Sequence, residues 1–85
     1  MLYRLYTEYK RPLNTSKIVS KYFQGFTVTK GIGYWMGLPE KSMIIEIVTE
    51  RAMDAKVKKL ADEIKRYNSQ EAVLVQRMEN SNWLI

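Results

Sequence analysis

The side chains that could take part in chemistry are carboxylates, amines, guanidinium groups and hydroxyls, because the 85-residue chain contains neither cysteine nor histidine. Disulfides, thiol nucleophiles, catalytic triads and Cys/His zinc sites are therefore excluded. Catalysis by two carboxylates needs a pair held about 5–10 Å apart. No spacing in the sequence pairs any two of the glutamates near predicted strands or turns, Glu8, Glu40, Glu46, Glu50 and Glu71. We expect a protein that is not an enzyme and that uses neither a metal nor a cofactor.

A candidate anion-binding site lies just after the first predicted strand. The adjacent cations Lys10 and Arg11 precede Thr15 and Lys17, where a short helix is expected to begin. The first backbone N–H groups of a helix have no partner within it and attract anions. Lys30 is a further cation assigned to this set. The alternative is a solvated capping loop, because the segment lacks the glycine-rich loop that wraps phosphate.

Residues 30–37 (KGIGYWMG) resemble the signature of RNA-recognition domains. Lys30, the two glycines that follow it and Tyr34 carry the resemblance. Ile32 stands where that signature has an aromatic residue, and isoleucine offers no π-face on which a base can stack. The simpler interpretation is that the glycines permit a bend in a hairpin.

The positive charge is unevenly distributed along the chain. The formal net charge is +5, and residues 1–42 hold seven Lys/Arg against two Asp/Glu, whereas residues 43–85 hold seven of each. An anionic partner would therefore bind the first half. A nucleic-acid-binding module that uses Lys10, Arg11, Lys30 and exposed tyrosines is an alternative function.

Aromatic residues provide the strongest indication of function. The chain has six tyrosines and two tryptophans, residue types that suit interfaces because they combine a large apolar body with a polar group. In the first predicted strand Tyr6 points to the opposite side from Tyr3 and Tyr9, so one aromatic set faces away from the helices. The residues predicted to form an interface are Tyr3, Tyr6, Tyr34, Trp35, Glu40, Ile44, Val48 and Trp83.

Hydrophobic periodicity predicts the elements that position these residues. Residues 2–9 alternate as a strand, and Asn14, Thr15 or Ser16 is expected to cap a short helix that Gly25 ends. Residues 26–37 form a strand with a bulge or bend at the glycines, and a turn at residues 37–40 joins it to a strand over 42–49.

The rest of the chain predicts one more helix and one more strand. A stripe of apolar residues over 53–67 indicates an amphipathic helix, with Asp54 or Thr49 as its cap and Asn68-Ser69 at its end. Residues 71–78 form a last strand, and the apolar residues 83–85 are expected to dock on the sheet or on a neighbouring subunit. The order is βαββαβ. It predicts one α+β domain over residues 1–85, a ferredoxin-like sandwich with two helices on one face of a four-stranded antiparallel sheet.

The last two thirds of the chain resembles the CutA family, whose fold is similar to that of the nitrogen-regulatory PII proteins. The motifs that carry the resemblance are residues 34–37 (YWMG), 44–49 (IIEIVT), 67–73 (YNSQEAV) and 82–85 (NWLI). The resemblance implies a homotrimer in which Tyr34, Trp35 and Glu40 lie near a cleft between subunits. The Cys and His that the family associates with metals have no counterpart here. Residues 33–75 also resemble a small uncharacterised bacterial family of ferredoxin-like domains.

These observations predict a homo-oligomeric binding or regulatory module that acts through protein–protein contacts or a small anionic ligand at a subunit cleft. The favoured oligomer is a trimer, with a dimer as the alternative. A small inhibitor or adaptor encoded by a mobile element is a further alternative. We expect a cytoplasmic protein, because the charged first residues do not fit a signal peptide and no segment fits a membrane span.

Overall fold

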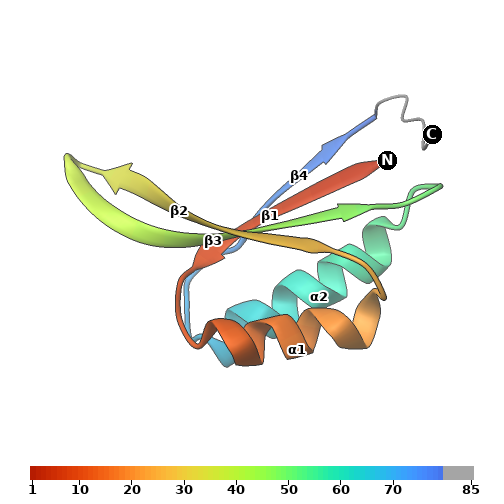
Figure 1. Ribbon diagram of the computed structural model, residues 1–85, viewed down its shortest axis with the longest axis horizontal. Coiled ribbons are helices and arrows are strands. Elements are labelled where there is room, and N and C mark those ends of the chain that lie inside the picture. The colour runs from red at the N-terminus through yellow and green to blue at the C-terminus, as the bar shows by residue number, and fades with distance from the viewer. Residues whose placement is uncertain (80–85) are drawn as a thin grey trace.

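The computed structural model describes residues 1–79, and they form one sheet with two helices on one of its faces (Figure 1). The elements are β1 (Leu2–Glu8), α1 (Pro12–Tyr22), β2 (Thr27–Trp35), β3 (Leu38–Val48), α2 (Asp54–Tyr67) and β4 (Leu74–Met78). The strand order is β2-β3-β1-β4, and every neighbouring pair is antiparallel. The predicted ferredoxin-like α+β fold is confirmed.

The core lies between the helices and one face of the sheet, which we call the helix-covered face. The odd-numbered residues from 3 to 7 in β1 and from 43 to 47 in β3 are buried, whereas the residues between them are partly exposed. Helix α1 adds Ile18 and Val19, and α2 adds Val57, Leu60 and Ile64. Burial of each such side chain contributes about 1.5–3 kcal/mol before the entropy of ordering is counted. The opposite face, which we call the helix-free face, is covered by no helix or second sheet among the described residues.

The hairpin of β2 and β3 is longer than the rest of the sheet. β1 pairs with β3 only between Ser42 and Val48, so residues 32–41 form a two-stranded extension that we call the hairpin arm. Figure 1 shows this arm reaching past the ends of both helices. Within residues 1–79 no helix lies against it and no third strand pairs with it, and the Tyr9 N–H that donates to the Lys41 carbonyl joins it to β1 only at its base.

The structure corrects the predicted course of the hairpin. The pairing of β2 with β3 advances one residue at a time from Thr27 to Trp35, so the glycines form no bulge. A Cβ added at Gly31 would lie 3.2 Å from Ile44 Cδ1, which means that this glycine allows the Ile44 side chain to pack closely. The turn consists of Met36 and Gly37 rather than residues 37–40. Both have positive φ, as in a type I′ hairpin.

The helix boundaries also differ from the prediction. Helix α1 begins at Pro12, after Arg11 in the left-handed conformation, and no side chain caps it. Proline is suited to the first helical position because its N–H group is not needed there. Gly25 does not have the positive φ of a C′ glycine, and the helix ends at the extended Phe23.

The C-terminal half matches the prediction more closely. Helix α2 ends at Asn68 as expected, but its N-cap is Met53, so neither Asp54 nor Thr49 occupies that position. Strand β4 is shorter than predicted, beginning at Leu74. The predicted docking of residues 83–85 lies outside the described residues.

Candidate functional site

The hairpin arm exposes the largest group of apolar side chains in the described chain. Five of the nine exposed large hydrophobic residues lie in it, each 66–85% exposed, namely Ile32, Tyr34, Trp35, Met36 and Leu38. Three of the other four lie on strands, and Leu13 alone lies on a helix. An unsupported hairpin is marginally stable in water, and apolar groups gathered on one region are typical of an interaction site.

The helix-free face continues this apolar surface towards the other end of the sheet. The register places Leu2 beside Val48 and Met78, and two residues further along it places Arg4 beside Glu46. A third row consists of Tyr6, Ile44 and Leu74.

Most of the apolar groups in these rows retain some access to solvent. Val48 is 64% exposed and Leu74 is 58% exposed. Between the two apolar rows, the Arg4 guanidinium donates to Glu46 Oε2 at 2.7 and 2.9 Å, and this bond raises the pKa of Arg4. The face therefore presents apolar rows on either side of one paired charge.

A groove with a volume of about 790 Å³ lies between the hairpin arm and the start of β4. Its lining combines aromatic and acidic side chains, with Lys41 as the one basic residue. The aromatic residues are Tyr6, Tyr34 and Trp35, and the acidic ones are Glu8, Glu40 and Glu71. Carboxylates raise the local concentration of cations and lower that of anions. The groove thus favours an apolar or cationic group over the small anion expected from the sequence.

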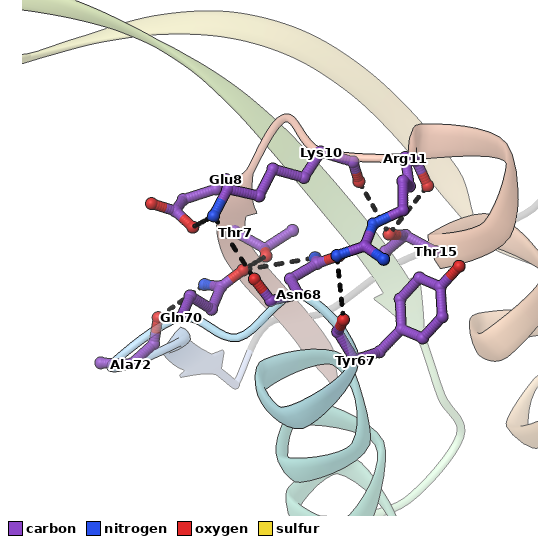
Figure 2. A network of polar contacts seen from close by, with 9 residues as sticks. All are labelled: Thr7, Glu8, Lys10, Arg11, Thr15, Tyr67, Asn68, Gln70 and Ala72. Carbon is purple, nitrogen blue, oxygen red and sulfur yellow. Dashed lines mark hydrogen bonds and ion pairs between the residues drawn. The ribbon is translucent and has the colours of Figure 1, made fainter.

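Two of the predicted anion ligands, Lys10 and Arg11, instead contact the end of α2 (Figure 2). The Arg11 guanidinium donates to the carbonyl oxygen of Tyr67 at 3.2 Å and lies 4.7 Å from the centre of the Tyr67 ring. Lys10 Nζ donates to the carbonyl oxygen of Asn68 at 3.4 Å. The last carbonyls of a helix lack partners and carry partial negative charge, so both cations stabilise this helix end.

The remaining members of that set form no anion-binding site with them. Thr15 is fully buried, and its hydroxyl donates to the carbonyl oxygens of Lys10 and Arg11 at 3.3 and 3.2 Å. Its prediction as an anion ligand is therefore wrong. Lys17 is exposed on α1, and Lys30 Nζ lies 4.9 Å from the centre of the Tyr9 ring. The cations proposed for nucleic-acid binding thus have contacts within the chain.

A network of amide and hydroxyl groups, which the sequence analysis missed, fixes one wall of the groove (Figure 2). Gln70 Oε1 accepts from the Thr7 hydroxyl at 2.6 Å and from Asn68 Nδ2 at 3.3 Å, while Gln70 Nε2 donates to the Ala72 carbonyl at 2.7 Å. Asn68 is fully buried, and its Oδ1 has no partner within the described residues. The loop over residues 69–72 is therefore held in place by polar side chains separated in sequence.

The predicted interface residues fall into four groups. Tyr34, Trp35 and Glu40 lie on the hairpin arm, and Tyr6, Ile44 and Val48 lie on the helix-free face. Tyr3 is 1% exposed beneath the helices, so its prediction as an interface residue is wrong. Trp83 lies outside the described residues. Six of the eight residues therefore lie on the two surfaces described above.

Tyr3 has a structural role that its position in the alternation could have indicated. Its hydroxyl accepts from the Met53 backbone N–H at 2.7 Å and donates to Asp54 Oδ1 at 2.5 Å. Asp54 Oδ2 in turn accepts from the Arg77 guanidinium at 2.8 Å. Burial raises the pKa of Tyr3, and the hydrogen bond from Tyr3 lowers the pKa of Asp54. These contacts connect β1, the start of α2 and β4.

Within residues 1–79 no group of three or more acidic side chains is arranged to hold a metal ion. In the same part of the chain no helix has the length and apolar character needed to cross a membrane. No model of a known protein family matches the chain, and a search of curated proteins finds no match either.

Proposed function

We propose that this protein is a non-enzymatic binding module that assembles with copies of itself through the hairpin arm and the helix-free face. One observation carries the proposal: among residues 1–79, eight of the nine exposed large hydrophobic residues lie on the sheet or its hairpin turn, and five of them lie in the hairpin arm. Covering such side chains with protein removes apolar surface from water, which is the main favourable term in association.

The composition of these surfaces supports a protein partner. Tyr34 and Trp35 are of the types most often found as energetic centres of interfaces, and both are at least two-thirds exposed. The carboxylates of the neighbouring groove argue against a small anion as the main ligand. The resemblance to the CutA and PII proteins supports the same conclusion, because it implies contact between subunits near Tyr34, Trp35 and Glu40.

Sedimentation of the purified chain over a concentration range on the order of 1–300 µM tests the proposal. We expect a concentration-dependent rise above the 10.1 kDa mass of one chain. The variant Trp35→Ser should weaken association by at least about tenfold, because it removes a large exposed aromatic group from the arm.

The matched control is Leu13→Ser, which removes the one exposed large hydrophobic residue that lies on a helix in the described part of the chain. It should leave association unchanged. A chain that sediments as a monomer across the whole range contradicts the proposed function, as does equal weakening by the two variants.

A further inference from the structure

Strand β2 forms one edge of the sheet, and no strand of the described residues pairs with its outer side. It is nine residues long, and seven of these residues are exposed. The backbone N–H and C=O groups along the outer side of an edge strand have no partner in the sheet, so they can pair with a strand of another chain.

Most edge strands carry features that prevent such pairing, and β2 has few of them. The strand contains no proline, and its uninterrupted register with β3 shows that no bulge twists the edge away. Lys30 is its one charged residue. Because the Lys30 ammonium lies over the ring of Tyr9, which follows β1, it points inward across β3 rather than out over the free edge.

The hairpin turn determines which backbone groups face outward. The turn at Met36 and Gly37 makes Trp35 and Leu38 the hydrogen-bonded pair that closes it. Hydrogen-bonded and non-hydrogen-bonded pairs alternate in an antiparallel ladder, and Pro39, which has no N–H, accordingly lies opposite Tyr34 in a non-hydrogen-bonded pair. The residues whose backbone groups point to the free edge are therefore Val28, Lys30, Ile32 and Tyr34.

We infer that β2 pairs with β2 of a second copy, antiparallel and about a two-fold axis at Gly31, so that the two sheets become one eight-stranded sheet. This register makes hydrogen-bonded pairs between Val28 and the second copy's Tyr34 and between Lys30 and the second copy's Ile32. The two Gly31 residues face each other across the axis. The inference rests on the proposed self-association and places its contact at the edge of β2, whose residues 32–35 belong to the hairpin arm.

The side chains and backbone of β2 favour this register. The backbone groups that point outward from both copies face each other only when the two-fold axis passes through a residue position. An axis between two residues would place each outward-pointing residue opposite an inward-pointing one. An axis at Lys30 would place two ammonium groups opposite each other, which is unfavourable, and an axis at Ile32 would leave part of the strand unpaired. The axis at Gly31 uses all nine residues. It also places Tyr34 beside Val28 and Trp35 beside Thr27, the aromatic and β-branched pairs that stabilise sheets.

The self-complementary register identifies a second copy as the occupant of this edge. A two-fold contact closes on itself and gives a dimer, whereas pairing of β2 with β4 of another copy would continue from head to tail. The CutA-like trimer expected from the sequence is a different assembly, so the mass of the oligomer separates the two.

The absence of cysteine from the chain allows a direct test. In a non-hydrogen-bonded pair the two Cα atoms are about 4.5 Å apart, a distance that a disulfide spans. Gly31→Cys should therefore form an intermolecular disulfide under mild oxidation at micromolar concentration. The new Cβ meets only the flexible end of Ile44, at 3.2 Å. The control Thr29→Cys lies on the same face of the strand, but its two copies would be separated by about 13 Å along the strands, so it should not cross-link.

A second variant tests the backbone contact without a cross-link. Ile32→Pro removes an outward N–H and leaves the hydrogen bonds between β2 and β3 intact, because proline is tolerated where an edge strand faces solvent. We expect the dimer dissociation constant to rise by at least about tenfold. Ile32→Thr keeps the N–H and the β-branched shape, and should weaken the dimer less.

The outcomes distinguish the inference from the function on which it rests. A mass of twice 10.1 kDa together with cross-linking of Gly31→Cys alone supports the inference. The two-fold contact is overturned if the oligomer has the mass of a trimer or grows without limit. It is also overturned if an oligomer forms but the two cysteine variants cross-link equally or not at all. Each of these outcomes leaves the proposed function standing. A monomer at every concentration overturns both.

Discussion

Tyr3 shows how a single hydroxyl can connect three elements. Its ring is buried in the core, yet its hydroxyl oxygen accepts a hydrogen bond from the backbone N–H of Met53, just before α2. The same hydroxyl donates a hydrogen bond to Asp54. A buried polar group is tolerated when it is hydrogen-bonded. In this position it also provides an acceptor for the N–H of Met53, the N-cap of a helix that has no side-chain cap.

The variant Tyr3→Phe should lower the free energy of unfolding by about 1–3 kcal/mol, because it leaves the partly buried N–H of Met53 without its acceptor and removes the hydrogen bond to Asp54. Urea denaturation at neutral pH measures this change. The control Tyr9→Phe removes a hydroxyl that makes no hydrogen bond in the described residues and should change stability little.

The effect of Tyr3→Phe should depend on pH with a defined sign. The hydrogen bond from Tyr3 lowers the pKa of Asp54 in the folded protein, so this bond to the ionised carboxylate stabilises the fold above the unfolded pKa, near 3.8. That contribution is lost as the pH falls through the lower, folded pKa. The difference in stability between the native chain and Tyr3→Phe should therefore narrow below about pH 3.8. A difference that stays constant from pH 7 to acid contradicts this assignment.

The turn of the hairpin arm carries a large apolar residue that suits neither its backbone conformation nor its exposure to water. Its turn places Met36, 85% exposed, at φ 51°. A residue with a Cβ is strained in this conformation by roughly 1 kcal/mol, whereas Asn followed by Gly is the preferred pair for a type I′ turn. Met36 thus places a large apolar side chain at a turn position where asparagine would be more stable. Such a residue is expected where the tip of a hairpin contributes to an interface.

Met36→Asn should raise the free energy of unfolding by about 0.5–1 kcal/mol, because asparagine adopts positive φ with less strain. Gly37→Ala should lower it by a similar amount, since φ at this residue is 79°. Thermal unfolding of both variants measures the two changes in the free energy of unfolding. Low protein concentration is used, because self-association then contributes least to stability. A decrease for Met36→Asn would contradict the assigned turn.

Over the whole molecule, charge is distributed by layer. The two helices carry seven Lys/Arg against three Asp/Glu, and the four strands carry four against three. The excess that the sequence places in residues 1–42 lies mainly on α1, at Lys17 and Lys21, and in the loop at Lys10 and Arg11. The sheet, where we propose association, is close to neutral.

Association through the sheet should consequently resist salt. Each copy carries a formal charge of +5, and salt screens the repulsion between two such copies over about 10 Å at 0.1 M. The dimer should become slightly tighter between about 0.05 and 0.5 M NaCl, as measured by sedimentation. Dissociation at high salt would instead indicate an interface built on ion pairs.

The order of elements was predictable because alternation and helical periodicity follow from which face of each element is buried. Local preferences were less reliable where the rest of the chain decided the outcome. Gly31 suggested a bulge, but the close packing of Ile44 explains it. The start of α1 was placed at a Ser/Thr/Asn cap, whereas Pro12 and the contacts of Arg11 with α2 determine it.

The candidate site was only partly predictable for a related reason. The exposed aromatic residues of the arm and the residues of the helix-free face follow from alternation within strands. The roles of Lys10 and Thr15 depend on the end of α2 and on carbonyls that lie close only in the folded chain. No spacing along the sequence records such a contact.

The sequence by itself determined the fold class, the two faces of the sheet and the absence of thiol and imidazole chemistry, because these depend on composition and on short-range periodicity. Only the tertiary structure decided that the arm extends beyond its supports, that Tyr3 is a core residue, and that the cations after β1 bind a helix end. The exposed edge of β2 also became visible only there, since strand order arises from pairing between segments distant in the chain.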